Sequence, residues 1–382
     1  MTYARSRLWL GISGVGLHVI LVSASLWFGL PHRFLSGLSS PAAIAITLFC
    51  FIAISVPSDV LGGYYLPRLH GRTNISRARF LASWFRGVVL QATVLGLCAA
   101  AILEVARWVG NWAGIACFAS LMVILLLAQS LIAQWIGGLK ISSILSAANE
   151  LGSHTKLPKI ALPISIQSIV FQSADPGFVG GIVGLPGRER LILPAAWWND
   201  LTTEALATEL TRRQGVLATG SRTRGLFVAL MWNFVGFIVS SNMPASSLAD
   251  AAGLVQCALW FTLWSFVGLL TLPSINRPGV LEADHFALDQ GISATEIASA
   301  ISLLDSLQDD EPSRSRWIER IFHPIPSVER RIAALGDAHS SKGAWHCART
   351  TLYLSWACFG FLSRAVHCNA GRPELWVLFP GD

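Results

Sequence analysis

Six long runs of apolar residues, none with a charged side chain, alternate with polar segments along the chain. An α-helix needs about 20 apolar residues to cross the hydrocarbon of a bilayer, and each run is near or above that length. The pattern therefore predicts about six transmembrane helices. The runs cover residues 8–31, 41–58, 87–103, 108–139, 225–249 and 251–276.

A seventh apolar run, residues 350–363, has only 14 residues. That length is more typical of a helix buried in protein, or lying at the membrane interface, than of a span. The first run lacks the small-residue cleavage site of a signal peptide and is followed by further spans. We therefore expect it to be a retained helix.

The polar segments predict a soluble part with mixed α and β structure. Residues 180–193 contain two short apolar stretches around Pro186 and Gly187, which is typical of a β-hairpin. Residues 159–170 are rich in Ile and Val but contain Pro163, which predicts an edge strand or an irregular strand. Helices are expected at about residues 203–220, 280–290, 293–307 and 327–335.

The fold class that follows is a mainly α integral membrane protein with a mixed α+β soluble domain. The soluble domain is split in sequence by a pair of spans. We expect four N-terminal transmembrane helices in residues 1–139, the first half of the soluble domain in 140–224, a transmembrane hairpin in 225–276 and the second half of the soluble domain in 277–382.

Composition supports a membrane location. The chain is 53% hydrophobic and 13% charged, whereas soluble domains carry about 25% charged residues. The net charge of +6 does not indicate nucleic-acid binding, because no pattern of interleaved basic and aromatic residues is present. Membrane lipid is the partner that the basic residues predict.

The distribution of arginine predicts the orientation, because short cytoplasmic loops are enriched in Lys and Arg. The loop between the second and third spans holds five arginines, whereas the other short loops between spans hold at most one basic residue. We therefore expect a multi-pass protein of the cell membrane with both termini and the soluble domain in the cytoplasm. The five arginines are Arg68, Arg72, Arg77, Arg79 and Arg86.

Four segments resemble a known family in their order and spacing. The hairpin at 180–193 precedes L-T-T-E-A-L-A-T-E-L at 201–210, and a pair of spans follows. Then come N-R-P-G-V-L-E-A-D-H-F-A-L at 276–288 and H-P-I-P-S-V-E-R-R-I-A-A-L at 323–335. This order resembles the membrane-embedded gluzincin metallopeptidases, that is, the HtpX heat-shock peptidases and the CAAX prenyl endopeptidases. The resemblance implies a gluzincin-like cytoplasmic domain, with structural roles for Arg277, Asp284, His323, Pro324 and Arg331.

The zinc-binding residues that this resemblance implies are missing. In the family, two His of an H-E-x-x-H helix bind zinc, the Glu acts as general base, and a later Glu is the third ligand. This chain contains no H-E-x-x-H. Spacing favours an alignment that places Arg212, Arg213 and Val216 at the motif positions, and matching the letters E-L gives Thr208, Glu209 and Arg212 instead. In either case Val280 stands at the third-ligand position.

These replacements cannot hold zinc. A guanidinium has no lone pair to donate and stays charged, and the valine side chain has no donor atom. We therefore expect no metal cofactor. A substitute metal site could be formed by three residues that share one helical face, Glu282, His285 and Asp289. We expect these residues to form a solvated polar face and to bind no metal.

The sequence thus predicts a catalytically inactive relative of zinc metalloendopeptidases that binds a membrane protein or peptide. The alternative is an active membrane zinc metalloendopeptidase with non-standard ligands. A transporter or channel is disfavoured, because neither inverted repeats nor paired intramembrane charges are visible.

The predicted topology can be tested with reporter fusions. A reporter that is active only outside the cytoplasm, fused after Asp382, should be inactive. The same reporter inserted at Gly37, between the first two spans, should be active and is the matched control. Activity of the fusion after Asp382 would show that the orientation is wrong.

Overall fold

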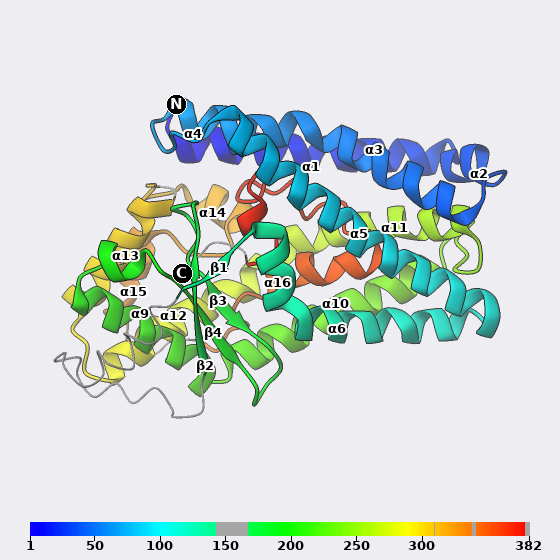
Figure 1. The fold of residues 1–382 in the computed structure, drawn as a ribbon. Helices are drawn as coiled ribbons and strands as arrows, with labels where there is room; N and C mark the ends of the chain where they lie inside the picture. Colours follow the sequence, from blue (N-terminus) through cyan, green and yellow to red (C-terminus); the bar gives the residue numbers. More distant parts are fainter. Residues whose placement is uncertain (143–166, 309, 338–340, 379–382) are drawn as a thin grey trace.

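The computed structural model describes residues 1–142, 167–308, 310–337 and 341–378. Its long helices run side by side at one end, and a small sheet with shorter helices lies at the other (Figure 1). The helical end contains the apolar runs, and the sheet end contains the two polar segments that the sequence places apart. The two halves of the soluble part therefore come together in space.

In the described part of the chain, six helices are long and apolar enough to cross a membrane, which confirms the expectation of a mainly helical chain with about six such helices. They are α1 (Tyr3–Trp27), α3 (Ser40–Val60), α5 (Arg77–Val109), α6 (Asn111–Gly137), α10 (Ser221–Ser241) and α11 (Ala251–Thr271). The second continues from α3 through a π-helical turn, η1 (Leu61–Tyr65), into α4 (Leu66–Leu69), and the short helix α2 (Leu30–Leu35) follows α1.

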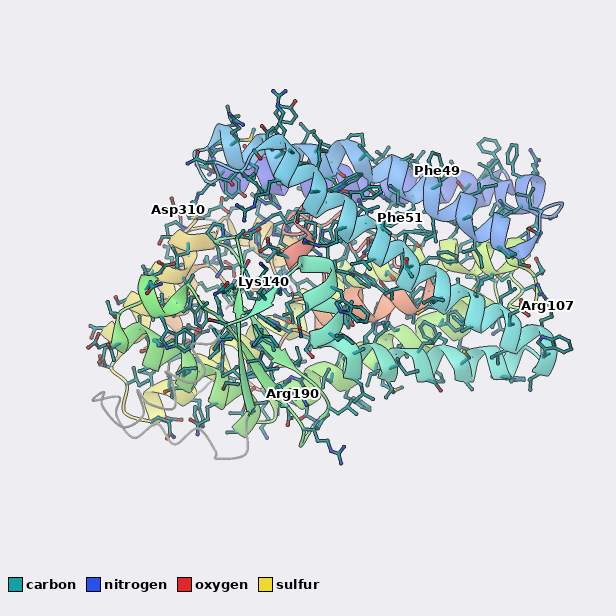
Figure 2. All side chains as sticks on the ribbon, viewed as in Figure 1. Phe49, Phe51, Arg107, Lys140, Arg190 and Asp310 are labelled. Atoms are coloured by element: carbon teal, nitrogen blue, oxygen red, sulfur yellow. The ribbon has the colours of Figure 1, made fainter. Side chains whose placement is uncertain are left out.

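The spans divide their apolar residues between an inner and an outer face. On α3, Phe49 is 70% exposed and Phe51 is 4% exposed, and the two side chains are labelled in Figure 2. Residues two apart lie on opposite sides of a helix. Soluble proteins rarely expose large apolar patches. The exposed apolar side chains on the outer face of the spans therefore indicate a surface that faces lipid.

The soluble part contains a four-stranded sheet in the order β1-β2-β4-β3. Strands β2 (Gln167–Gln172) and β4 (Arg190–Pro194) are parallel, whereas β1 (Lys140–Ile141) and β3 (Gly181–Val183) each pair antiparallel with their neighbours. The predicted hairpin is confirmed, with Ile182 opposite Leu191. The prediction of an edge strand is wrong for residues 167–170, because β2 lies between β1 and β4. Residues 159–166 of that prediction lie outside the described part.

Among its described residues, the soluble part also contains the helices α8 (Trp197–Asp200), α9 (Thr203–Ala218), α12 (Pro273–Asp289), α13 (Ala294–Gln308), α14 (Arg316–Phe322) and α15 (Val328–Ala334). The Thr202 hydroxyl caps α9 by accepting a hydrogen bond from the Ala205 N–H. The sixth span ends at Thr271, earlier than predicted, because Pro273 opens α12 and cannot continue α11.

The C-terminal segment, residues 341–378, runs through the interior between the spans (Figure 1). It contains α16 (Cys347–Leu354) and two 3-10 turns, η2 (Ser355–Cys358) and η3 (Pro373–Leu375). The run 350–363, expected as a buried or interfacial helix, is buried, but its α-helix ends at Leu354. Trp356 and Trp376 are fully buried.

A buried aspartate fixes this segment to α3. Asp59 accepts hydrogen bonds from the Arg364 guanidinium, from the Gly371 N–H at 2.8 Å and from Trp84 Nε1 at 2.9 Å. Close backbone contact accompanies the ion pair, since a Cβ at Gly63 would lie 2.1 Å from the Gly371 carbonyl oxygen. Glycine is therefore required where the segment crosses η1.

We expect Asp59→Asn to destabilise the protein strongly, because it leaves the buried Arg364 charge without a counter-ion. The loss should be about 3–5 kcal/mol, as for other buried pairs broken on one side, and should appear as a lower unfolding midpoint in detergent. Glu104→Gln is the control. It breaks the exposed pair with Arg107 and should cost at most about 1 kcal/mol. Equal midpoints for the two variants would contradict the anchoring role of Asp59.

Candidate functional site

The two helices that the resemblance assigns to the zinc site, α9 and α12, pack against each other as expected. The buried face of α9 carries polar and charged side chains in its middle, including Glu209, Arg212 and Arg213. The buried face of α12 carries Val280 and Asp284, one turn apart. The buried faces of α9 and α12 therefore carry charged side chains at some turns and apolar side chains at others.

Asp284 accepts hydrogen bonds from two arginines. Arg212 Nε lies 2.6 Å from Asp284 Oδ1, and Arg331 on α15 donates from Nη2 to Oδ1 at 2.8 Å and from Nε to Oδ2 at 2.9 Å. Arg212 also donates to Glu209 one turn earlier on α9. All four side chains are at most 5% exposed. We call these four residues the Asp284 cluster.

The arginines decide the protonation of this carboxyl. Burial by itself raises the pKa of Asp284, but the charges and hydrogen bonds of Arg331 and Arg212 oppose it, and the pKa lies below its ordinary value. Asp284 is therefore ionised at neutral pH. The cluster contains two carboxylates and two guanidinium groups, so its charges compensate one another without a metal ion.

The other two ligand positions of the favoured alignment are apolar. Val216 and Val280 are 1% and 0% exposed and belong to the same core cluster, together with Ala283. Position 212 lies beside a carboxylate, which is the usual partner of a metal-binding His, but here it carries a guanidinium. In the second alignment the Thr208 hydroxyl donates to the Glu204 carbonyl of its own helix.

Arg213, at the general-base position of the favoured alignment, holds α9 to the sheet. Its Nη2 donates to the Val179 carbonyl at 2.7 Å and its Nη1 to the Ile192 carbonyl at 3.4 Å. Its guanidinium also lies 4.9 Å from the ring centre of Trp197. These contacts give Arg213 a structural role in place of a base.

The proposed substitute ligands do not form a metal site. Glu282 is only 9% exposed and accepts a hydrogen bond from Arg224 Nη2 at 2.6 Å. The expectation of a solvated polar face is therefore wrong for Glu282, because α10 supplies a partner for it. His285 is half-buried and Asp289 is exposed. Within the described ranges, no three His, Cys, Asp or Glu side chains come together as a group that could hold a metal ion.

The remaining family-matching residues contact the polypeptide. Arg277 donates to the Glu319 carbonyl at 2.7 Å, and Pro324 accepts from Asn276 at 2.6 Å. His323 is 6% exposed and contacts the ring of His367. Burial, followed by the positive charge of Arg314, holds the pKa of His323 well below its ordinary value. His323 is therefore neutral at physiological pH.

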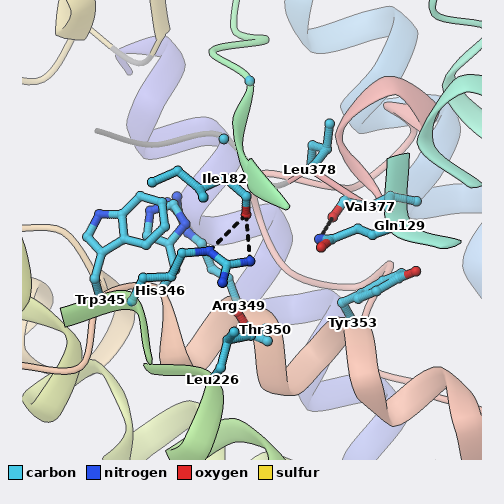
Figure 3. Close-up of a pocket in the computed structure, with 13 residues that line it drawn as sticks. Gln129, Ile182, Leu226, Trp345, His346, Arg349, Thr350, Tyr353, Val377 and Leu378 are labelled. Atoms are coloured by element: carbon cyan, nitrogen blue, oxygen red, sulfur yellow. Dashed lines mark hydrogen bonds between the residues drawn. The ribbon is translucent and has the colours of Figure 1, made fainter. Parts of the chain in front are cut away.

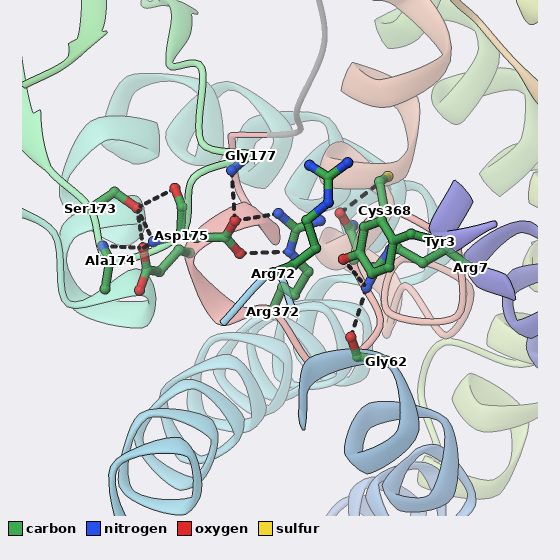
Figure 4. A network of polar contacts seen from close by, with 12 residues as sticks. Tyr3, Arg7, Gly62, Arg72, Ser173, Ala174, Asp175, Gly177, Cys368 and Arg372 are labelled. Atoms are coloured by element: carbon green, nitrogen blue, oxygen red, sulfur yellow. Dashed lines mark hydrogen bonds and ion pairs between the residues drawn. The ribbon is translucent and has the colours of Figure 1, made fainter. Parts of the chain in front are cut away.

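Two contacts made by arginine side chains could not be predicted from the sequence. Arg372 of the C-terminal segment donates from Nε to Asp175 Oδ2 at 2.6 Å, and Arg7 on α1 donates to the Gly62 carbonyl at 2.7 Å (Figure 4). Each joins residues far apart in the chain. No local sequence pattern marks either residue as part of a pair, since the partners are set by the tertiary fold.

The residues at the ligand positions do not fit a zinc ion. Zinc is bound by thiolate, imidazole or carboxylate groups in a nearly tetrahedral arrangement. Here Arg212 supplies a positive charge, Val216 and Val280 supply hydrocarbon, and the two nearby carboxylates are occupied by arginines.

Comparisons with known proteins show the fold. No protein-family model matches the chain, and no curated protein matches it. The crystal structure of S. mikatae Ste24p is similar, with a TM-score of 0.60 and 11% sequence identity, over 88% of this chain and 99% of that chain. Ste24p is a membrane zinc metallopeptidase, a CAAX protease. The likeness confirms a multi-pass membrane fold of the metallopeptidase type, and at this identity it shows the fold alone.

The Asp284 cluster predicts a defined dependence of stability on pH. The folded-state pKa of Asp284 is lowered, so its contribution is complete above the unfolded value of about 3.9 and is lost as pH falls through the folded-state pKa. Asp284→Asn should destabilise the protein by about 3–5 kcal/mol at neutral pH and flatten the acid limb of the profile of unfolding midpoint against pH.

Asp289→Asn is the control, because it removes an exposed acid from the same helix. It should change the free energy of unfolding by less than about 0.5 kcal/mol. An acid limb that is equally steep in Asp284→Asn and in the unmodified chain would contradict the role assigned to this carboxylate.

Proposed function

We propose that this chain is a peptidase-like integral membrane protein that has lost zinc-dependent hydrolysis and binds a protein or peptide partner at the membrane. One observation carries the proposal. Arg212, at a metal-ligand position, is buried in an ion pair with Asp284, while Val216 and Val280 fill the other ligand positions with hydrocarbon. We assign the chain to a degenerate branch of the gluzincin metallopeptidases of HtpX and CAAX type, with the soluble domain in the cytoplasm.

Electrostatics supports the loss of the metal. A zinc ion near Arg212 would face a fixed positive charge in a site of low dielectric constant, where repulsion between cations is strong. Moving Arg212 away to admit the ion would break its ion pairs with Glu209 and Asp284 and would leave Asp284 paired with Arg331. Breaking one side of a buried ion pair costs about 3–5 kcal/mol.

The edge of the sheet is partly closed to a partner. An edge strand presents unpaired carbonyl and N–H groups that can add another strand. In the described sheet β3 is such an edge, and Arg222 on α10 donates to the Ile182 carbonyl at 3.2 Å and to the Gly184 carbonyl at 2.8 Å. Two acceptors of the edge are therefore already used. We expect the partner to bind elsewhere on the soluble part.

Exposed apolar side chains on α14 and α15 are candidate contacts for the partner. Trp317 is 73% exposed and Ile332 is 40% exposed. Aromatic residues are enriched at protein–protein interfaces, where they supply much of the binding energy. We propose that the partner is a membrane protein or peptide that contacts these exposed side chains.

Metal analysis tests the proposed loss of zinc-dependent hydrolysis. We expect the purified chain in detergent to carry no stoichiometric zinc and to show no peptidase activity that a chelator blocks. Replacing all four positions together, with Arg212→His, Arg213→Glu, Val216→His and Val280→Glu, should permit zinc binding. The new imidazole at position 212 would lie beside Asp284, which is the usual carboxylate partner of such a ligand.

The triple variant that keeps Val280 is the matched control and should bind zinc more weakly, because it lacks the third ligand. One zinc per unmodified chain, together with chelator-sensitive cleavage, would overturn the proposal in favour of an active enzyme with unusual ligands. Glu209, Glu282, His285 and Asp289 would then be the first residues to substitute.

A further inference from the structure

A large apolar groove lies among α1, α2, α3 and α11, and α2 is at the end of the spans that is remote from the sheet (Figure 1). Its volume is about 480 Å³. Its walls include Val22, Leu35, Phe51, Val255, Leu259 and Phe361. The cavity where the spans meet the sheet is much smaller, about 40 Å³, and polar side chains such as Gln129 and Arg222 line it (Figure 3). The two spaces therefore suit different occupants.

The polar groups in the walls of the apolar groove are already hydrogen bonded. None of the 16 described residues that line it is Asp, Glu, Lys or Arg. The Nδ1 of His18 donates to a carbonyl one turn earlier on α1 at 2.8 Å, and Ser55 Oγ lies 3.4 Å from its Nε2. The hydroxyls of Ser25 and Thr47 each donate to a carbonyl of their own helix. The groove therefore requires no polar ligand to satisfy its walls.

The apolar groove is continuous with the surface of the spans that faces lipid. Three of its lining residues are exposed on that surface, Leu21 at 37%, Phe34 at 71% and Ile46 at 44%. The deeper wall is buried, with Phe51 at 4% and Leu259 at 8%. The groove therefore leads from the lipid surface into the interior of the helical part.

The size of the apolar groove excludes a membrane-spanning helix as its occupant. A helix with its side chains is about 10 Å across and rises about 5.4 Å per turn, so the volume of about 480 Å³ would hold roughly one turn. An apolar cavity of about 150 Å³ already admits benzene. A space about three times larger has room for a flexible hydrocarbon of roughly 15 carbon atoms.

We propose that the apolar groove binds one acyl chain of a membrane phospholipid and retains it when the protein is extracted from the membrane. The chain fills a space that would otherwise be an empty cavity, which destabilises a folded protein. Because α1, α2, α3 and α11 all contribute to the walls, the bound chain holds these helices together. The inference depends neither on the zinc positions nor on the proposed protein partner.

The probe is phosphatidylcholine that carries a photoreactive diazirine in one acyl chain. The full-length protein is reconstituted into vesicles that contain this lipid, extracted into detergent and irradiated after unbound lipid has been removed. Labelling should reach one lipid per protein and fall on residues 18–35 and 46–54, which contain most of the lining residues. An excess of unlabelled phosphatidylcholine added before irradiation should remove the label, because the groove holds a single chain.

Two substitutions that add an aromatic ring to the wall should reduce the label. Thr47 and Cys50 both line the groove from α3. Labelling should fall roughly tenfold in Thr47→Phe and in Cys50→Phe, because overpacking a filled space is unfavourable by about that factor or more. Thr93→Phe is the matched control and should keep the full label. Thr93 also donates to the carbonyl four residues earlier, but it is exposed on α5 and does not line the groove.

The unfolding midpoint separates loss of the site from loss of the fold. In detergent, added phosphatidylcholine should raise the midpoint of the unmodified protein and of Thr93→Phe, because a ligand that binds the folded state stabilises it. A groove variant that folds should lose this shift together with the label, and if one of the two does not fold, the other decides. The proposal is overturned if the label spreads evenly over the outer faces of the spans, or if a folded groove variant keeps both the label and the shift.

Discussion

A buried carboxylate between two arginines is the interaction on which the soluble part of this protein depends. Asp284 on α12 binds Arg212 on α9 and Arg331 on α15, so one side chain connects three helices that are separated in the sequence. A charge in that position cannot remain unpaired, since its desolvation would cost several kcal/mol. The helices are therefore held in one arrangement, and that arrangement brings positions 212, 216 and 280 together.

Arginine is the organising cation at this level of the fold. Arg212 binds carboxylates, whereas Arg213 and Arg222 bind carbonyl groups of the sheet and the loops beside it. A guanidinium offers five donors in a fixed plane, so it can satisfy several acceptors at once. The same property makes it unable to polarise water or coordinate zinc. A fold similar to that of Ste24p can thus contain a site whose arginines hold the helices and the sheet together.

Local patterns were sufficient to predict the spans and the hairpin. The spans were predictable because hydrocarbon demands long uncharged runs, and the hairpin because Pro186 and Gly187 separate two short apolar stretches. The position of β2 inside the sheet was not predictable, since pairing partners come from distant segments. Nor was the burial of Glu282, because its partner Arg224 belongs to a span that is remote in sequence.

The sequence by itself determined that the chain crosses a membrane about six times and that positions 212, 216 and 280 carry no zinc ligand, because side-chain chemistry at a position does not depend on the fold. Only the tertiary structure decided what those residues do instead. It also placed the C-terminal segment between the spans, where Asp59 binds Arg364 across more than three hundred residues of chain. Ion pairs of this kind depend on distance in space, and the order of residues along the chain carries no direct record of it.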